Sequence, residues 1–119
     1  MVMGIFLPAP LSTEDTTAIV ERKLQWILSA CAPLEVWLFG SAAIGDMTEA
    51  SDIDLILLFR DVTAIREAQR MLARTPRLDG WPQDLLWYRR NDFYEKSTVG
   101  GVPMIAVEDG RRIYQRENP

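Results

Sequence analysis

The sequence predicts one α/β (α+β) domain in which helices pack on a small mixed sheet. Two observations point to this class. Short apolar runs with the composition of strands alternate along the chain with longer segments whose apolar residues recur at helical spacing. The 119 residues suffice for one hydrophobic core, and they contain no repeat, low-complexity tract or linker. We therefore expect a single domain over residues 1–119, with its core at about residues 12–116.

The first predicted helix begins after Ser12. Asp15 follows three residues later, which is the pattern of an N-cap with an acidic partner in the first turn. Pro33 ends the helix because proline cannot continue the backbone hydrogen bonding. The apolar residues between these points recur every three or four positions and predict one buried stripe, formed by Val20, Leu24, Ile27, Leu28 and Cys31.

Two strands are predicted next, separated by a turn. Residues 34–39 are aromatic and partly alternating, as in a strand. Gly40 and Ser41 then open a short turn or helix that ends near Gly45. Residues 53–59 contain six apolar residues in seven, so we expect a strand that is covered on both faces.

The second half of the chain predicts a helix, a loop, a third strand and a short finish. Asp61 caps a helix that ends before Pro76, and residues 77–82 form a loop. Residues 85–88 form an apolar strand. The remaining predicted elements are a short helix beginning at residues 92–95 and broken at residues 100–101, a last turn at residues 103–110, and an edge strand at residues 111–115.

Composition excludes several kinds of chemistry. The chain has no histidine, which excludes histidine zinc sites and imidazole bases, and its single cysteine, Cys31, cannot form an internal disulfide. The net charge of −4 has the wrong sign for direct nucleic-acid binding. No apolar run reaches membrane-spanning length, and residues 1–7 lack the basic start of a signal peptide. We therefore expect a cytoplasmic protein.

Asp52 and Asp54 are the most informative residues. Alternate residues of a strand point to one side, so the two carboxylates project together at the start of the strand at residues 53–59. They would repel one another and lose solvation, and a divalent cation such as Mg²⁺ relieves both effects. A bare Asp-x-Asp also occurs at ordinary solvated strand starts, so the pair alone does not establish a metal site.

The strand directions decide which residues join this pair. Ser41 lies just past the end of the first strand and meets the aspartates only if the first two strands are antiparallel. Asp84 begins the third strand and joins them only if that strand is parallel to the second, with the helix after Asp61 as crossover. Asp79 is an alternative third carboxylate.

Gly40 and Ser41 suit a phosphate site. Glycine lets the backbone approach a phosphate, and a serine hydroxyl donates to phosphate oxygens. Gly-Ser is also a common way to end a strand, and neither a Walker A loop nor a G-x-G-x-x-G motif is present.

Taken together, Gly40-Ser41, a ten-residue spacer and Asp52-x-Asp54 resemble the minimal nucleotidyltransferases of the DNA polymerase β superfamily. The segment beginning at Asp84 resembles that family's third acidic strand. The resemblance implies a polymerase-β-like nucleotidyltransferase core. It also implies that Asp52, Asp54 and Asp84 are catalytic and bind Mg²⁺, and that Gly40 and Ser41 bind the ATP phosphates.

The same resemblance implies a partner. Minimal proteins of this kind are commonly antitoxins that attach AMP to a tyrosine of a helical HEPN ribonuclease toxin. A core of this length holds no acceptor domain, so the acceptor would come from a partner or through a homo- or hetero-oligomer. Two alternatives stay open: transfer to the hydroxyl of a small molecule such as an aminoglycoside, and a non-catalytic module that neutralises the toxin by contact.

Trp81 is the aromatic residue that sequence leaves most open. It lies between Gly80 and Pro82 in a polar loop, whereas most other aromatic residues fit the core. It would either contact a base or a partner, or pack against its own domain.

Overall fold

The computed structural model describes residues 7–117; residues 1–6 and 118–119, including most of the segment on which the signal-peptide expectation rests, lie outside the described residues. Its sheet has the strand order β3-β2-β1-β4. The strand bounds are β1 Glu35–Phe39, β2 Ile53–Phe59, β3 Gln83–Arg89 and β4 Arg111–Gln115. Strand β1 is antiparallel to β2 and β4, and β2 is parallel to β3. The β1–β2 and β2–β3 directions are those that the predicted site requires.

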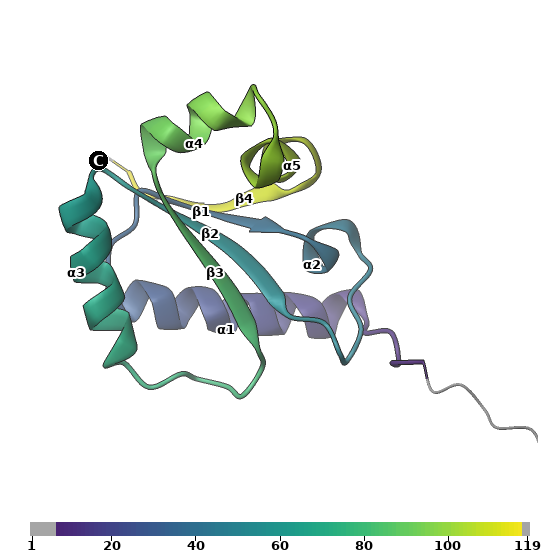
Figure 1. Cartoon of the computed structure of the whole chain (residues 1–119). Coiled ribbons are helices and arrows are strands. Elements are labelled where there is room, and N and C mark those ends of the chain that lie inside the picture. Colours follow the sequence, from purple (N-terminus) through teal and green to yellow (C-terminus); the bar gives the residue numbers. More distant parts are fainter. Residues whose placement is uncertain (1–6, 118–119) are drawn as a thin grey trace, which may run out of the picture.

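Helices cover both faces of this mixed sheet (Figure 1). Helices α1 and α3 pack on one face, and α4 and α5 lie on the other. Helix α3 is the crossover between the parallel strands β2 and β3. The helix bounds are α1 Thr13–Ala30, α2 Ser41–Ile44, α3 Val62–Ala73, α4 Arg90–Ser97 and α5 Gly101–Asp109.

Strand β2 separates two hydrophobic cores. Because side chains alternate along a strand, its odd-numbered residues face α1 and α3, and its even-numbered residues face α4 and α5. The larger core joins β2 to the two long helices through Ile53, Leu55, Leu57, Val20, Ile27, Ala68 and Leu72. The smaller core consists of Ile56, Leu58, Phe93 and Ala106, with Leu86 and Tyr88 packed against it. On the face of β2 that carries Asp54, the smaller core covers the part formed by Ile56 and Leu58 and does not include Asp54.

Both predicted helix caps are confirmed. The hydroxyl of Ser12 accepts a hydrogen bond from the Asp15 N–H at 3.0 Å, at the start of α1. The carboxylate of Asp61 accepts one from the Ala64 N–H at 2.8 Å, at the start of α3. Each cap satisfies a backbone donor that the helix cannot satisfy itself.

Helix α1 buries Val20 and Ile27 of the predicted stripe, together with residues outside it. Leu28 is 36% exposed, whereas Trp26 is 6% exposed and Lys23 only 1%. The prediction that Leu28 is buried was therefore wrong. The buried face of α1 includes Lys23, because the loop before β3 supplies polar partners for its ammonium group.

Two other elements are longer than predicted. Strand β3 begins at Gln83, two residues before the predicted start, because its pairing with β2 extends to the polar end of the strand. The segment after Gly100 is a helix of nine residues and not a single turn. Pro103 fits there because the first turn of a helix needs no backbone N–H donor.

Within residues 7–117, no helix has both the length and the apolar character needed to cross a membrane.

Candidate active site

The strand register places the predicted acidic residues at one edge of the sheet. Asp54 of β2 is paired with Asp84 of β3, and with Phe39 of β1 on its other side. Gly40 directly follows Phe39. The sheet therefore brings Asp52, Asp54, Asp84 and the Gly40-Ser41 turn to the same edge, as the predicted strand directions required. The catalytic and binding roles of these residues stay predictions.

Gly40 lies against the carboxylate of Asp54. Its φ angle is +71°, a conformation that residues with a side chain rarely adopt. A Cβ atom at this position would overlap Asp54 Oδ2. The sequence suggested that glycine makes room for a phosphate; the structure adds that glycine makes room for the Asp54 carboxylate.

Negative charge accumulates around Asp54. Burial raises the pKa of this carboxyl above its usual value, and repulsion from Asp84 and then Asp52 raises it further. Asp54 is half-buried, whereas Asp52 and Asp84 are exposed. The edge therefore holds carboxylates that repel one another.

Asp79, the alternative third carboxylate, serves another purpose. Its Oδ1 atom accepts hydrogen bonds from Lys23 Nζ at 2.6 Å and from the Trp81 N–H at 2.7 Å. Burial acts to raise the pKa of Asp79, but these hydrogen bonds and the positive charges of Lys23 and Arg22 outweigh it and lower the pKa. Asp79 is thus neutralised by α1, while Asp84 lies beside Asp54.

Ser41 occupies the first position of the four-residue helix α2. Its hydroxyl is half-buried and contacts the Met47 sulfur at 3.7 Å. This weak contact leaves the oxygen available to a better acceptor or donor. Its role in phosphate binding stays a prediction.

The chemistry of the acidic edge suits Mg²⁺. Carboxylate oxygens are the hard ligands that this ion prefers, and an ion would favour the charged form of Asp54, whose pKa is raised by burial and by repulsion from Asp84 and Asp52. Among residues 7–117, however, no three acidic, cysteine or histidine side chains already converge as a metal site. Binding would therefore require Asp52, Asp54 and Asp84 to turn toward a common ion.

A cavity of about 560 Å³ lies on the α1 side of the sheet, opposite the face that carries Asp54. It is lined by residues of α1 and by the loop before β3, among them Ile19, Arg22 and Trp81. None of the three predicted catalytic aspartates lines it. The acidic edge is therefore not enclosed by this cavity, and a second molecule has access to the exposed Asp52 and Asp84.

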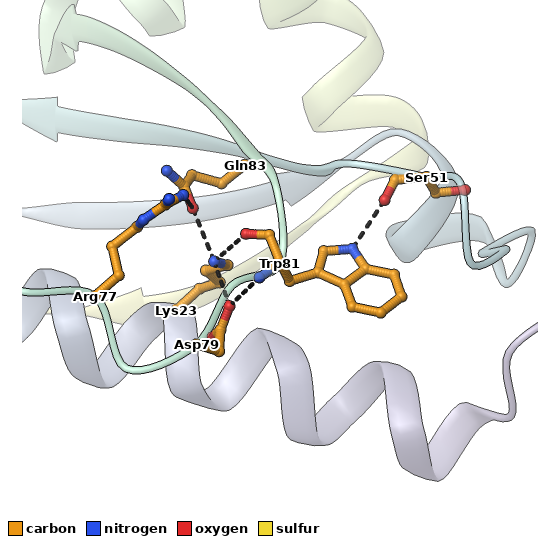
Figure 2. A network of polar contacts seen from close by, with 6 residues as sticks. All are labelled: Lys23, Ser51, Arg77, Asp79, Trp81 and Gln83. Atoms are coloured by element: carbon orange, nitrogen blue, oxygen red, sulfur yellow. Dashed lines mark hydrogen bonds and ion pairs between the residues drawn. The ribbon is translucent and has the colours of Figure 1, made fainter.

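The structure also contains a polar network next to this edge that the sequence did not reveal (Figure 2). Lys23 of α1 binds Asp79, Trp81 and Gln83, and Trp81 in turn binds Ser51. Sequence patterns did not identify Lys23 because its partners lie 56 to 60 residues further along the chain.

Comparisons with known proteins agree with the fold. The chain is similar to the crystal structure of a "putative nucleotidyltransferase" from Sulfolobus solfataricus, with a TM-score of 0.58 and 21% sequence identity, over 91% of this chain and 92% of that one. No curated protein sequence matches it. The model of the family described as "Nucleotidyltransferase domain" matches residues 18–113. Since that match covers most of the sequence, the chain belongs to the nucleotidyltransferase domain family.

Proposed function

We propose that this protein transfers AMP from ATP to a hydroxyl group of a partner protein. The partner we propose is a HEPN-type ribonuclease toxin, with a tyrosine as acceptor, and the protein is then the antitoxin of the pair. The observation that supports transfer best is the pairing of Asp54 with Asp84 at the edge of the sheet where Gly40 also lies. The family of the chain supports nucleotidyl transfer in general.

In this proposal Asp52, Asp54 and Asp84 hold Mg²⁺, with ATP as the substrate. Bound Mg²⁺ neutralises the charge of the triphosphate and of the departing pyrophosphate. The backbone at Gly40 and the hydroxyl of Ser41 bind and orient the phosphates. A cation held by Asp54 would offset the charge of this carboxylate and so reduce its repulsion of the triphosphate.

The proposed reaction is a single displacement at phosphorus with one proton transfer. The acceptor oxygen attacks the α-phosphorus of ATP, a new P–O bond forms, and the bond to pyrophosphate breaks. The acceptor proton passes to Asp84, whose exposed carboxylate is accessible to a hydroxyl from another molecule. The chain has no histidine, so a carboxylate is the available proton acceptor.

The exposure of the edge favours a macromolecular acceptor over a small one. A small acceptor is usually held in a cleft that buries most of its surface. Asp52 and Asp84 are exposed, and the described cavity beside α1 does not include them. A protein surface placed over the edge would supply both the acceptor and the missing cover.

Mass spectrometry of the partner tests this function. After incubation with ATP, Mg²⁺ and this protein, the toxin should gain about 329 Da per AMP, as displacement of pyrophosphate requires. Asp54→Ala should abolish the gain and the protection of cells from the toxin. An unmodified toxin, together with full protection by Asp54→Ala, would show that the protein acts by contact alone. An unmodified toxin with no protection by either protein would exclude the toxin as partner.

A further inference from the structure

We propose that Lys23 and Trp81 are positioning residues for nucleotidyl transfer, which hold Asp52 and Asp84 in register at the acidic edge. This inference rests on the proposed function, because the geometry that it explains is that of the predicted metal and nucleotide site. Neither residue lies on the face of the sheet that carries the aspartates. Both act through the two loops that lead into β2 and β3 (Figure 2).

Lys23 fixes the loop before β3 to α1. Its ammonium group donates to Asp79 Oδ1 at 2.6 Å, to Gln83 Oε1 at 2.7 Å and to the carbonyl oxygen of Trp81. An ammonium group has three protons, so these contacts use all of them. Gln83 is the first residue of β3 and directly precedes Asp84. Lys23 therefore fixes the loop on both sides of Trp81, up to the residue before Asp84.

Trp81 joins this loop to the loop before β2. Its indole N–H donates to the carbonyl oxygen of Ser51 at 2.8 Å, and Ser51 directly precedes Asp52. A backbone hydrogen bond from the Ile53 N–H to the Pro82 carbonyl, at 3.0 Å, lies next to it. One side-chain and one backbone contact thus join the chain on either side of Asp52 to the loop that leads to Asp84.

The energetics of Lys23 favour a positioning role over a contribution to stability alone. A buried ion pair loses the hydration of both charges, and apolar residues of similar volume often give equal or greater stability. Lys23 is 1% exposed and Asp79 13% exposed as side chains. What such a pair provides is a fixed arrangement of its partners. Here that arrangement sets the approach of Asp84 to Asp54, two carboxylates that repel one another.

Trp81→Phe tests the inference with little change in packing. Phenylalanine keeps an aromatic ring but loses the N–H that binds Ser51. Trp26→Phe is a matched control, because the Trp26 indole also donates to a backbone carbonyl, that of Thr75, at 2.9 Å. Trp26 is a residue of α1 and bonds to the chain just after α3, and Thr75 is nine residues before Asp84.

Calorimetry with the Mg²⁺ complex of a non-hydrolysable ATP analogue measures binding, and the rate of AMP transfer from ATP to the partner measures kcat. We expect Trp81→Phe to weaken binding about three- to tenfold, the equivalent of one hydrogen bond, and to lower kcat further. Trp26→Phe should leave both unchanged at a similar loss of thermal stability. Lys23→Met, measured where it is still folded, should weaken binding at least as much as Trp81→Phe.

The outcomes separate the two proposals. If the wild-type protein binds the complex and both tryptophan variants bind it equally well, the network is structural only and the positioning inference is wrong. If the wild-type protein does not bind the complex, the proposed function is wrong, and the positioning role falls with it. A decrease confined to Trp81→Phe and Lys23→Met supports both.

Discussion

Gly40 shows how one residue without a side chain shapes the acidic edge. Its positive φ angle and its contact with Asp54 both exclude a Cβ atom. The sequence identified the residue because Gly40-Ser41 precedes the aspartates at a defined spacing. It could not identify the contact with Asp54, because that contact depends on the antiparallel register of β1 and β2.

Gly40→Ala should therefore displace the Asp54 carboxylate. We expect a loss of about 1–3 kcal/mol in the free energy of unfolding, from backbone strain and overlap, and at least a tenfold loss in affinity for Mg²⁺–ATP. Gly45→Ala is the control, because Gly45 also has a positive φ angle, +80°, but a Cβ atom there has no neighbour within 4 Å. Chemical denaturation should show a smaller loss of stability in Gly45→Ala, whose backbone is in the left-handed helical region, and calorimetry should show lost binding only in Gly40→Ala. Retained binding in Gly40→Ala would contradict the account of this turn.

Cys31 should be a slow nucleophile. It lies just after α1, and burial raises the pKa of its thiol to about 11. At pH 8 this reduces the reactive thiolate on the order of a hundredfold relative to an ordinary cysteine, and alkylation should slow accordingly. Iodoacetamide labelling of the native and the denatured chain measures the ratio. Equal rates would show that the thiol is accessible and ionises normally.

At the scale of the elements, the contact between α1 and the loop before β3 depends on charge. Asp79 has a lowered pKa in the folded chain, so its ion pair with Lys23 stabilises the fold fully above the ordinary value of 3.8. This stabilisation is lost as the pH falls through the lowered pKa, because protonation then removes the charge.

Asp79→Asn makes this pH dependence measurable. At pH 7 the variant should be about 2–4 kcal/mol less stable, because the Lys23 ammonium stays buried without a charged partner. Unfolding titrations at decreasing pH should show the difference shrinking below pH 3.8, and the two proteins should come together only below the lowered pKa of Asp79, where the folded wild-type carboxyl also loses its charge. A stability difference that stays constant down to the lowest pH would exclude the ion pair as its cause.

Most elements could be predicted because their signals are local. Ser12 and Asp61 mark helix starts within four residues of chain, and the apolar run of β2 predicts a strand buried on both faces. Lys23 could not be predicted as buried, because a lysine on a helix counts as polar unless its distant partners are known. The hydrogen bond from Trp81 to Ser51 could not be predicted either, because the two residues are 30 positions apart in the sequence.

The candidate site was predictable to the extent that topology follows from sequence. Antiparallel β1–β2 and parallel β2–β3 pairs were required to bring Ser41, Asp54 and Asp84 together, and both are present. Asp79 binds Lys23, whereas Asp84 is paired with Asp54, and the role of Asp84 as third carboxylate stays a prediction. The orientation of the carboxylates toward an ion could not be predicted, because it depends on the ion itself.

At the scale of the whole molecule, the two faces of the sheet have different roles. The face covered by α1 and α3 holds the larger core and the network that supports the loops. On the opposite face, α4 and α5 pack against Ile56 and Leu58 of β2. The acidic edge, with Asp54, lies outside this packed region. This division leaves the edge accessible to another molecule while its supporting loops stay fixed.

Calorimetry with Mg²⁺–ATP tests the central claim, that this acidic edge binds the nucleotide with its metal, most directly. The wild-type protein should bind, and the double variant Asp52→Asn/Asp54→Asn should show no measurable binding. The variant should remain folded and be up to about 1 kcal/mol more stable without metal, a figure kept small because the carboxylates are partly solvated. Equal affinity of the wild-type protein and the double variant for Mg²⁺–ATP would contradict the account.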